Sequence, residues 1–214
     1  MKILLVNNES SAEDMGLIGR AGELGLSVPS YNVSNLEKVL KTYGEVTVCH
    51  HKDIGGLDFV PDCAFLSGRW APWNASTLEE DFAAELKLIR DGSVPVFGIC
   101  AGIQIMAFAF GAPCVPMQLR SGEHGYLPLT ILREHPLTAG LSGKMTCFEH
   151  HSEEAAFVPE GFDLLASTEI CQVEMIAHKE RKLCGAQFHP EFFSEKYPDG
   201  QKLIENFLEH YVKK

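Results

Sequence analysis

A chain of 214 residues is within the size range of one α/β domain and is long enough to bury a substantial core. Its formal net charge of −11 argues against nucleic acid as a partner, because phosphate groups require a basic surface. Apolar runs stay short of the roughly 20 residues that cross a bilayer. The seven cysteines show no C-x-x-C spacing, which indicates reduced thiols in a cytoplasmic protein.

The first half of the chain alternates between short apolar strands and helices. Asn35 is expected to cap the first helix, and Asp91-Gly92 to end the second. Alternation of β and α predicts an α/β fold of three layers, in which a mainly parallel sheet has helices on both faces. We expect strands at 2–6, 45–49, 63–66 and 94–97, and helices at 36–43, from the capping signals at 76–80 to about 90, and at 103–110.

After Gly111 the pattern changes to a series of strands, which predicts a smaller, strand-rich C-terminal portion. The chain has no internal repeat or low-complexity tract, so we expect a single domain over residues 1–214. The predicted strands are 127–132, 145–148, 163–167, 173–178 and 183–188, and a final helix covers about 200–211.

Residues 98–102 read Gly-Ile-Cys-Ala-Gly, which has the G-x-nucleophile-x-G form of a nucleophile elbow with Cys100 as the nucleophile. A strand-like run precedes it and a helical run follows it. The glycines allow a tight turn, and the positive end of the helix dipole favours the thiolate form of Cys100. The pattern therefore predicts acyl transfer through a cysteine, although a lone G-x-C-x-G also arises by chance around an inert buried thiol.

A second motif, His189-Pro190-Glu191, follows another strand-like run. On an extended segment the spacing of two residues puts both side chains on one side, and proline restricts their arrangement. A carboxylate beside an imidazole selects its tautomer and stabilises the imidazolium. Cys100 and His189 both follow predicted strands, where sites of open α/β sheets lie. The joint pattern predicts a catalytic group, rather than a core histidine and an inert thiol.

The other histidines carry weaker signals. His151 is a possible alternative base, but we expect no orienting carboxylate at a matching spacing, so it would shape a substrate wall with Ser152. The adjacent pairs at 50–51 and 150–151 have side chains that diverge on a strand. We therefore expect no metal site, and no cofactor.

At these residues the chain resembles the class I, triad-type glutamine amidotransferases, which include the glutaminase parts of GMP synthetase, anthranilate synthase and carbamoyl phosphate synthetase. Gly98, Cys100, Gly102 and Gln104 match the family's G-x-C-x-G-x-Q, and residues 185–191 match its G-x-Q-F-H-P-E. The resemblance covers about residues 36–211. It implies a flavodoxin-like α/β fold of the class I glutamine amidotransferase type.

The resemblance also implies the chemistry. Cys100 would attack the side-chain amide of L-glutamine and form a γ-glutamyl thioester. His189 would act as base and then as acid, and Glu191 would orient it. The backbone N–H groups of Ala101 and Arg69 would form the oxyanion hole. The residues expected to bind the substrate are Gln104, Ser67 and Ser152.

The oxyanion loop departs from the family's S-G-G-P-G, because residues 67–71 read Ser-Gly-Arg-Trp-Ala. A glycine conformation with positive φ would be strained by Arg69 or Ala71. Either the loop keeps its geometry with these side chains pointing away, or the hole assembles only when a partner or substrate rearranges it. Trp70 and Trp73 could anchor a lid or an interface, or pack in the core.

An insertion at about residues 9–34 separates the first strand from the first helix, whereas in the family the two follow almost directly. The segment contains four glycines and a proline and has weak helical character. It is either a plain surface excursion or a lid or docking element near the end of the first strand.

The resemblance further implies a separate synthetase partner that accepts the ammonia, since the chain has neither a synthetase domain nor a P-loop. Two alternatives remain. One is a stand-alone hydrolase of another γ-glutamyl amide, with Arg69 and the tryptophans reshaping the pocket. The other is a catalytically silent regulatory subunit, against which the intact motifs argue.

Overall fold

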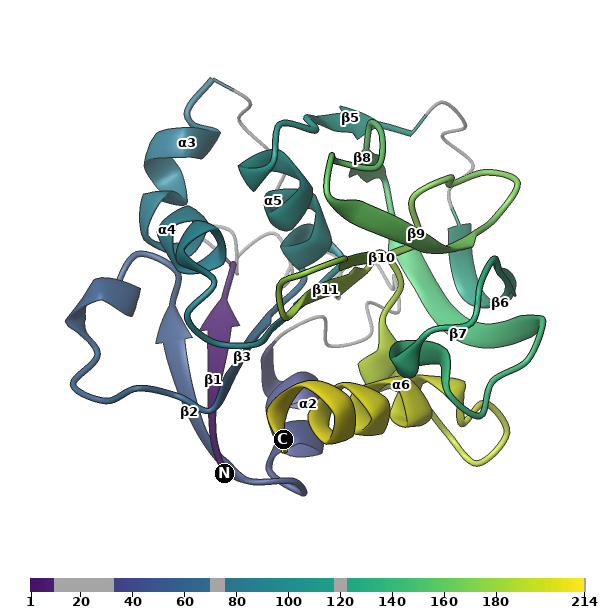
Figure 1. Cartoon of the computed structure of the whole chain (residues 1–214), viewed down its shortest axis with the longest axis horizontal. Coiled ribbons are helices and arrows are strands. Elements are labelled where there is room, and N and C mark those ends of the chain that lie inside the picture. The colour runs from purple at the N-terminus through teal and green to yellow at the C-terminus, as the bar shows by residue number, and fades with distance from the viewer. Residues whose placement is uncertain (10–32, 70–75, 118–122, 214) are drawn as a thin grey trace, which may run out of the picture.

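A nine-stranded sheet forms the centre of the computed structural model, which describes residues 1–9, 33–69, 76–117 and 123–213 (Figure 1). The strand order is β2-β1-β3-β4-β11-β10-β9-β6-β7. The five strands from β2 to β11 run parallel, and the remaining four pair antiparallel. In order across the sheet the strands are β2 (Glu45–His50), β1 (Lys2–Asn7), β3 (Cys63–Leu66), β4 (Val96–Ile99), β11 (Leu183–Ala186), β10 (Met175–His178), β9 (Phe162–Ser167), β6 (Glu123–Ile131) and β7 (Lys144–His151).

The central strands are short apolar runs because both of their faces are covered. All four residues of β3, β4 and β11 are buried. Continuous burial of this kind is typical of parallel strands between two helical layers. The antiparallel strand β7 instead alternates between buried and half-buried or exposed residues, as expected for a sheet with one covered face.

Helices cover the parallel part of the sheet on both sides (Figure 1). On one side lie α2 (Val33–Leu40) and α6 (Asp199–Phe207), whose core includes Phe65, Phe97 and Phe207. The helices on the other side share a second core that includes Leu86, Ile103 and Met106. They are α3 (Leu78–Asp81), α4 (Ala83–Asp91) and α5 (Ala101–Ala109). Two hydrophobic cores thus hold the sheet between the helical layers.

Smaller elements complete the described part of the chain. A two-stranded antiparallel sheet pairs β5 with β8 beside α5. Gly92 ends α4 in the left-handed conformation, with φ of 60°, as its sequence predicts. The smaller elements are β5 (Cys114–Pro116), β8 (Glu153–Ala155), η1 (Ile54–Gly56), η2 (Pro136–Thr138), η3 (Pro190–Phe192) and the π-helical turn η4 (Leu208–Val212).

The predicted fold class is confirmed, and three local predictions are corrected. The helix expected to run without a break to about residue 90 is divided into α3 and α4 at Phe82. The final regular helix ends at Phe207 and continues as η4. The third correction concerns Asn35, which is not an N-cap because α2 already includes Val33 and Ser34. Of the predicted insertion at 9–34, residues 10–32 lie outside the described residues.

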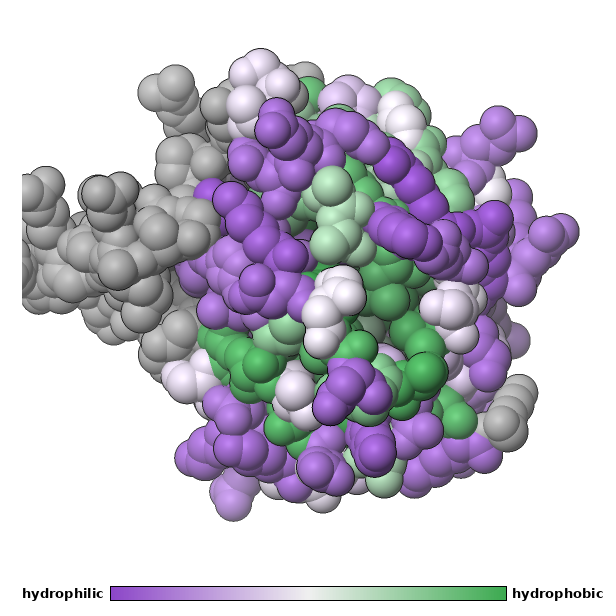
Figure 2. Space-filling view, turned by 90° about the vertical axis from the view of Figure 1, so that its left-hand side faces the viewer, coloured by the Kyte–Doolittle hydropathy of each residue, from purple (hydrophilic) through white to green (hydrophobic). Residues whose placement is uncertain are grey.

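The β2 end of the sheet is partly exposed. Figure 2 faces this side and shows apolar surface in the middle of the face, framed by polar side chains. Val48 of β2 is 40% exposed. Among the described residues, no helix is long and apolar enough to span a membrane.

Candidate active site

Cys100 lies at the sharp turn between β4 and α5. Its φ of 51° is the only positive value of a non-glycine residue in the described ranges. A conformation of this kind costs about 1–3 kcal/mol and persists where the surrounding structure enforces it. The backbone N–H of Cys100 donates a 2.8 Å hydrogen bond to the carbonyl of Ala186, which ties the turn to β11. The predicted nucleophile elbow is therefore present in the backbone.

The two glycines of the elbow allow α5 to pack directly on the sheet. A Cβ atom on Gly98 would lie 2.5 Å from the carbonyl carbon of Gly102, and one on Gly102 would lie 2.6 Å from the carbonyl oxygen of Leu66. Both distances are too short for a carbon atom, so any larger residue would push α5 away from the sheet. The elbow spacing thus fixes Cys100 at the start of the helix.

His189 and Glu191 form a buried pair immediately after β11. His189 Nδ1 lies 2.8 Å from Glu191 Oε1, and the two side chains are only 1% and 7% exposed. The pairing was expected on an extended segment, and that expectation is wrong. His189 instead precedes the 3₁₀ turn η3, and Pro190 is the first residue of that turn. The backbone N–H of His189 donates a 2.8 Å bond to the carbonyl of Phe148, which fixes the start of the turn.

Three loops meet at Cys100, and each follows a different parallel strand. Gly68 lies in the loop after β3. A Cβ atom on Gly68 would be 3.0 Å from Cε1 of His189 and 3.5 Å from Cβ of Cys100. The backbone of Gly68 therefore packs against both side chains. Cys100, His189 and Gly68 meet where the carboxyl ends of β3, β4 and β11 lie side by side, as in other open α/β sheets.

The charges around His189 favour its protonated form. Burial alone would lower the pKa of His189. The carboxylate of Glu191 and the sulfur of Cys100, through their charges and hydrogen bonds, outweigh that effect and raise it above the usual value. The arrangement therefore favours the imidazolium form of His189 beside the sulfur of Cys100.

Other described cysteines are held as inert thiols. Burial raises the pKa of Cys63 and that of Cys114 to about 12, and it also raises the pKa of Cys147 and of Cys184. None of these four has the backbone geometry of Cys100.

Hydrogen bonds from Asn8, the residue just after β1, hold the loop after β3. The backbone N–H of Asn8 donates to Ser67 Oγ at 3.0 Å, and its side-chain Nδ2 donates to the Ser67 carbonyl at 2.9 Å. Ser67 Oγ donates in turn to the Gly68 carbonyl at 2.9 Å. The Ser67 hydroxyl is thus engaged within the loop, and its predicted contact with substrate stays a prediction.

Arg69 extends toward the end of β1. Its guanidinium donates to the Asn8 carbonyl and lies over the Phe82 ring, 5.6 Å from the ring centroid. Its φ is not positive, so this backbone position carries no left-handed strain. These features agree with the alternative in which the loop keeps its geometry and its side chains point away. Trp70, Ala71 and Trp73 lie outside the described residues.

Glu85 also contacts Asn8 and was not predicted from the sequence. It lies on the buried face of α4, and its Oε1 accepts a 3.3 Å hydrogen bond from Asn8 Nδ2. Burial raises the pKa of Glu85 to about 8, against smaller opposing effects from Asn8 and Arg69. A carboxyl among the apolar positions of α4 was the available signal, because buried acids require a partner.

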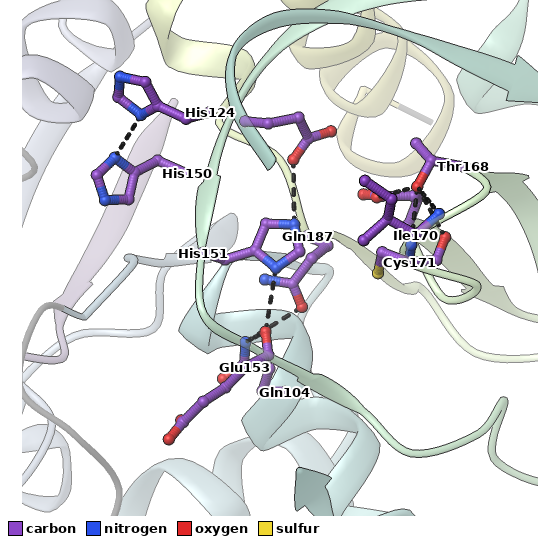
Figure 3. A network of polar contacts seen from close by, with 11 residues as sticks. Gln104, His124, His150, His151, Glu153, Thr168, Ile170, Cys171 and Gln187 are labelled. Atoms are coloured by element: carbon purple, nitrogen blue, oxygen red, sulfur yellow. Dashed lines mark hydrogen bonds and ion pairs between the residues drawn. The ribbon is translucent and has the colours of Figure 1, made fainter. Parts of the chain in front are cut away.

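Gln104 lies one turn after Cys100, on the inner side of α5. Its Nε2 donates to the Glu153 carbonyl at 2.7 Å and to Gln187 Oε1 at 3.1 Å (Figure 3). Gln104 therefore links α5 to β8 and to the segment after β11. Ser152 is exposed between β7 and β8. Contacts of Gln104 and Ser152 with a substrate stay predictions, as do the oxyanion roles of Ala101 and Arg69. As the first residue of α5, Ala101 has a backbone N–H with no acceptor inside the helix.

The expectation that His151 has no carboxylate partner is wrong. Its Nε2 lies 3.3 Å from Glu149 Oε2, and its Nδ1 lies 3.2 Å from the Glu153 carbonyl (Figure 3). The carboxylate precedes His151 by two residues on β7, so both side chains lie on the same face. His150 faces the opposite way and pairs with His124, with 3.0 Å between their Nδ1 atoms.

Comparison with protein families supports one assignment. The family model described as glutamine amidotransferase class-I matches residues 29–211. The match includes Cys100, His189 and Glu191.

Curated relatives are glutamine-hydrolyzing GMP synthases. That of Clostridium perfringens is 40% identical over 122 residues, which are 57% of this chain and 23% of the relative. A glutamine-hydrolyzing GMP synthase subunit of Methanothrix thermoacetophila is 33% identical over 121 residues, 56% of this chain and 65% of the relative. The chain spans about a quarter of the length of the bacterial GMP synthases that it matches.

Solved structures agree with this pattern. A crystal structure described as a GMP synthase subunit from Thermoplasma acidophilum has a TM-score of 0.75 and 28% identity, covering 98% of this chain and 92% of that one. A glutamine amidotransferase from Thermotoga maritima has a TM-score of 0.67 at 16% identity, covering 99% and 82%. The second likeness shows the fold alone.

Proposed function

The chain belongs to the class I glutamine amidotransferase family, and from this we propose that it hydrolyses the side-chain amide of L-glutamine through Cys100, His189 and Glu191. One observation carries the proposal. The strained Cys100 at the start of α5 lies beside an imidazole whose Nδ1 is 2.8 Å from a buried carboxylate.

In the first step the Cys100 thiolate attacks the side-chain amide carbon of glutamine. The C–S bond forms first and gives a tetrahedral oxyanion. The C–N bond then breaks as the carbonyl reforms, and the imidazolium of His189 gives its proton to the departing ammonia. Glu191 holds His189 through Nδ1, so the other ring nitrogen faces the reacting atoms. The product of this step is a γ-glutamyl thioester.

In the second step water hydrolyses the thioester. His189, now neutral, takes a proton from the attacking water, and the C–S bond breaks to release glutamate. The thiolate and imidazolium are then restored, so no cofactor is consumed. In both steps a tetrahedral oxyanion forms and requires hydrogen-bond donors.

Two backbone N–H groups are the donors we propose for that oxyanion. Ala101 supplies one from the N-terminus of α5, where the helix dipole also favours negative charge. Arg69 supplies the other from the loop held by Asn8. A donor of this type is worth about 3–4 kcal/mol of barrier in related acyl-transfer sites.

We propose that the ammonia passes to a separate synthetase. This rests on the relatives, since some are named as one subunit of a GMP synthase and others, named GMP synthase, extend far beyond the matched region. A GMP-forming synthetase is the first partner to test. Co-purification of the tagged chain from its native cells should recover such a protein, and its absence would count against this part of the proposal.

The activity test is release of ammonia and glutamate from L-glutamine by the purified chain, with a Cys100→Ala variant beside it. Turnover in the wild type and none in the variant is the expected result. A panel of other γ-glutamyl amides, compared by kcat/KM, tests the rival hydrolase. A preference for another amide by more than about tenfold would replace glutamine as the substrate.

A further inference from the structure

A second cluster of reactive side chains lies apart from Cys100 and is fully enclosed. His151, Cys171 and Glu174 each offer a ligand atom within 4.8 Å of the others, and all three residues are buried. They come from β7, from the loop after β9 and from the residue just before β10. Figure 3 shows His151 and Cys171 among them. Imidazole, thiolate and carboxylate are the three ligand types of protein-bound zinc.

The ring of His151 is oriented as a metal ligand would be. Its Nδ1 lies 3.2 Å from the Glu153 carbonyl, an arrangement in which Nδ1 carries the proton. In that tautomer Nε2 carries the lone pair that binds a metal, and a carbonyl on the second ring nitrogen is the usual support of a ligating histidine.

Glu149 lies next to His151 but is not among the three residues whose ligand atoms all lie within 4.8 Å of one another. Its Oε2 lies 3.3 Å from His151 Nε2. Both side chains are at most 1% exposed, so Glu149 is a buried neighbour of His151 beside the proposed site.

Thr168 supports the other side of the cluster. Its hydroxyl lies within donating distance of Glu174 Oε1 at 3.3 Å and of the Cys171 carbonyl at 3.2 Å, and a carboxylate held through one oxygen can bind an ion through the other. The same hydroxyl accepts the backbone N–H of Cys171 at 2.8 Å, so Thr168 also fixes the residue that carries the thiol (Figure 3). Support of this kind commonly surrounds ligating carboxylates.

We propose that His151, Cys171 and Glu174 form a buried site for a divalent transition metal, with zinc as the best fit. Mixed nitrogen, sulfur and oxygen ligands favour zinc over magnesium or calcium. Three protein ligands leave one position of a tetrahedral ion for a water molecule.

The position of the cluster gives the ion a role in shaping the active site. The Glu153 carbonyl that supports His151 also accepts the hydrogen bond of Gln104. Gln104 lies one turn after Cys100, so an ion at the cluster would help to hold β8 in its place beside α5. This site has no motif in the sequence, because its ligands are separated by up to 23 residues (174 − 151).

The first test is the metal content of the protein purified without chelator, followed by replacement of the ion with cobalt(II). We expect one zinc ion per chain, and a cobalt form with thiolate-to-metal charge-transfer absorption. Cys171→Ala should lose that absorption and weaken zinc binding about 100-fold. Cys63→Ala is the matched control, because Cys63 is equally buried but lies in β3. It should keep both properties.

A second pair of measurements distinguishes a loss of metal binding from a loss of folding. Thr168→Val preserves shape and should weaken zinc binding about tenfold, and added zinc should raise the melting temperature of the apo wild type. Two results would overturn the proposal. One is wild-type protein that takes up no stoichiometric zinc or cobalt. The other is cobalt absorption that survives in Cys171→Ala. Either result would leave a plain ion pair between His151 and Glu149.

Discussion

Asn35 Nδ2 donates a 2.9 Å hydrogen bond to the backbone carbonyl of Glu191, 156 residues further along the chain. The bond joins α2 to the 3₁₀ turn that carries the carboxylate beside His189. Asn35 thus supports the orientation of Glu191 from a different layer of the fold. The helical layer that contains α2 and α6 therefore contributes directly to the geometry of the site.

Removal of this bond should affect catalysis more than stability. Asn35→Ala is expected to lower kcat about tenfold with little change in KM, because η3 loses an anchor, and to cost about 1 kcal/mol of unfolding free energy. Steady-state kinetics with L-glutamine and thermal unfolding check both. Lys38→Ala, an exposed position on the same helix, is the control. Equal kinetics in the two variants would contradict the proposed role.

Glu191→Gln should change the pH dependence of the reaction. The charges of Glu191 and Cys100 raise the pKa of His189, so the imidazolium persists from neutral into alkaline solution and is lost as pH rises through the raised value. Without the carboxylate, burial lowers that pKa, and the alkaline limb of kcat/KM should move to lower pH. The rate should fall by at least about 100-fold.

The control for this profile is Glu195→Gln, an exposed position in the same loop. Its alkaline limb should coincide with that of the wild type. An unchanged limb in Glu191→Gln would show that Glu191 does not set the protonation of His189.

Gly68→Ala tests the close packing at the site. The new Cβ atom would lie 3.0 Å from His189 Cε1, which is tighter than ordinary contact, so either the imidazole or the loop must shift. A small displacement of a catalytic group can cost about 100-fold in kcat/KM. Gly55→Ala is the matched control, since nothing lies within 4 Å of a Cβ atom there. Activity of Gly68→Ala near that of the control would contradict the described geometry.

Glu85→Gln should alter how stability depends on pH. Burial raises the pKa of Glu85 to about 8 in the folded protein. Between an unfolded pKa of about 4.5 and that value, the folded state binds more protons, so its stability falls as pH rises. Glu85→Gln does not titrate, so its free energy of unfolding does not fall in this way. Relative to the wild type, that free energy should rise by on the order of 3 kcal/mol from pH 4.5 to pH 8.

Denaturant unfolding at several pH values measures this difference. Glu80→Gln, at an exposed position, should follow the wild type at every pH. A Glu85→Gln variant whose stability stays parallel to the wild type across this range would show that Glu85 is ionised in the folded protein.

The two motifs were predictable because each is local. The glycines around Cys100 and the spacing of His189 and Glu191 act over a few residues. The resemblance to a family then indicated that the two motifs belong to one site. The conformation of the second motif was not predictable, because Pro190 is compatible with both an extended segment and a 3₁₀ turn.

What the sequence could not reveal depends on residues brought together by the fold. Asn8 and Glu85 meet across 77 positions to hold the loop of Ser67, and neither has a motif around it. The prediction for Asn35 was wrong because a preference for helix caps does not exclude a place inside α2, where tertiary contact decides. The partner of His151 was missed although Glu149 lies two residues away on the same strand.

The most direct test of the central claim is the mass of the intact protein, acid-quenched during turnover of L-glutamine. We predict a covalent γ-glutamyl adduct on Cys100, located by peptide mapping and absent from Cys100→Ala. Turnover with no adduct on Cys100 under conditions that stabilise thioesters, or glutamine hydrolysis that survives in Cys100→Ala, would contradict it.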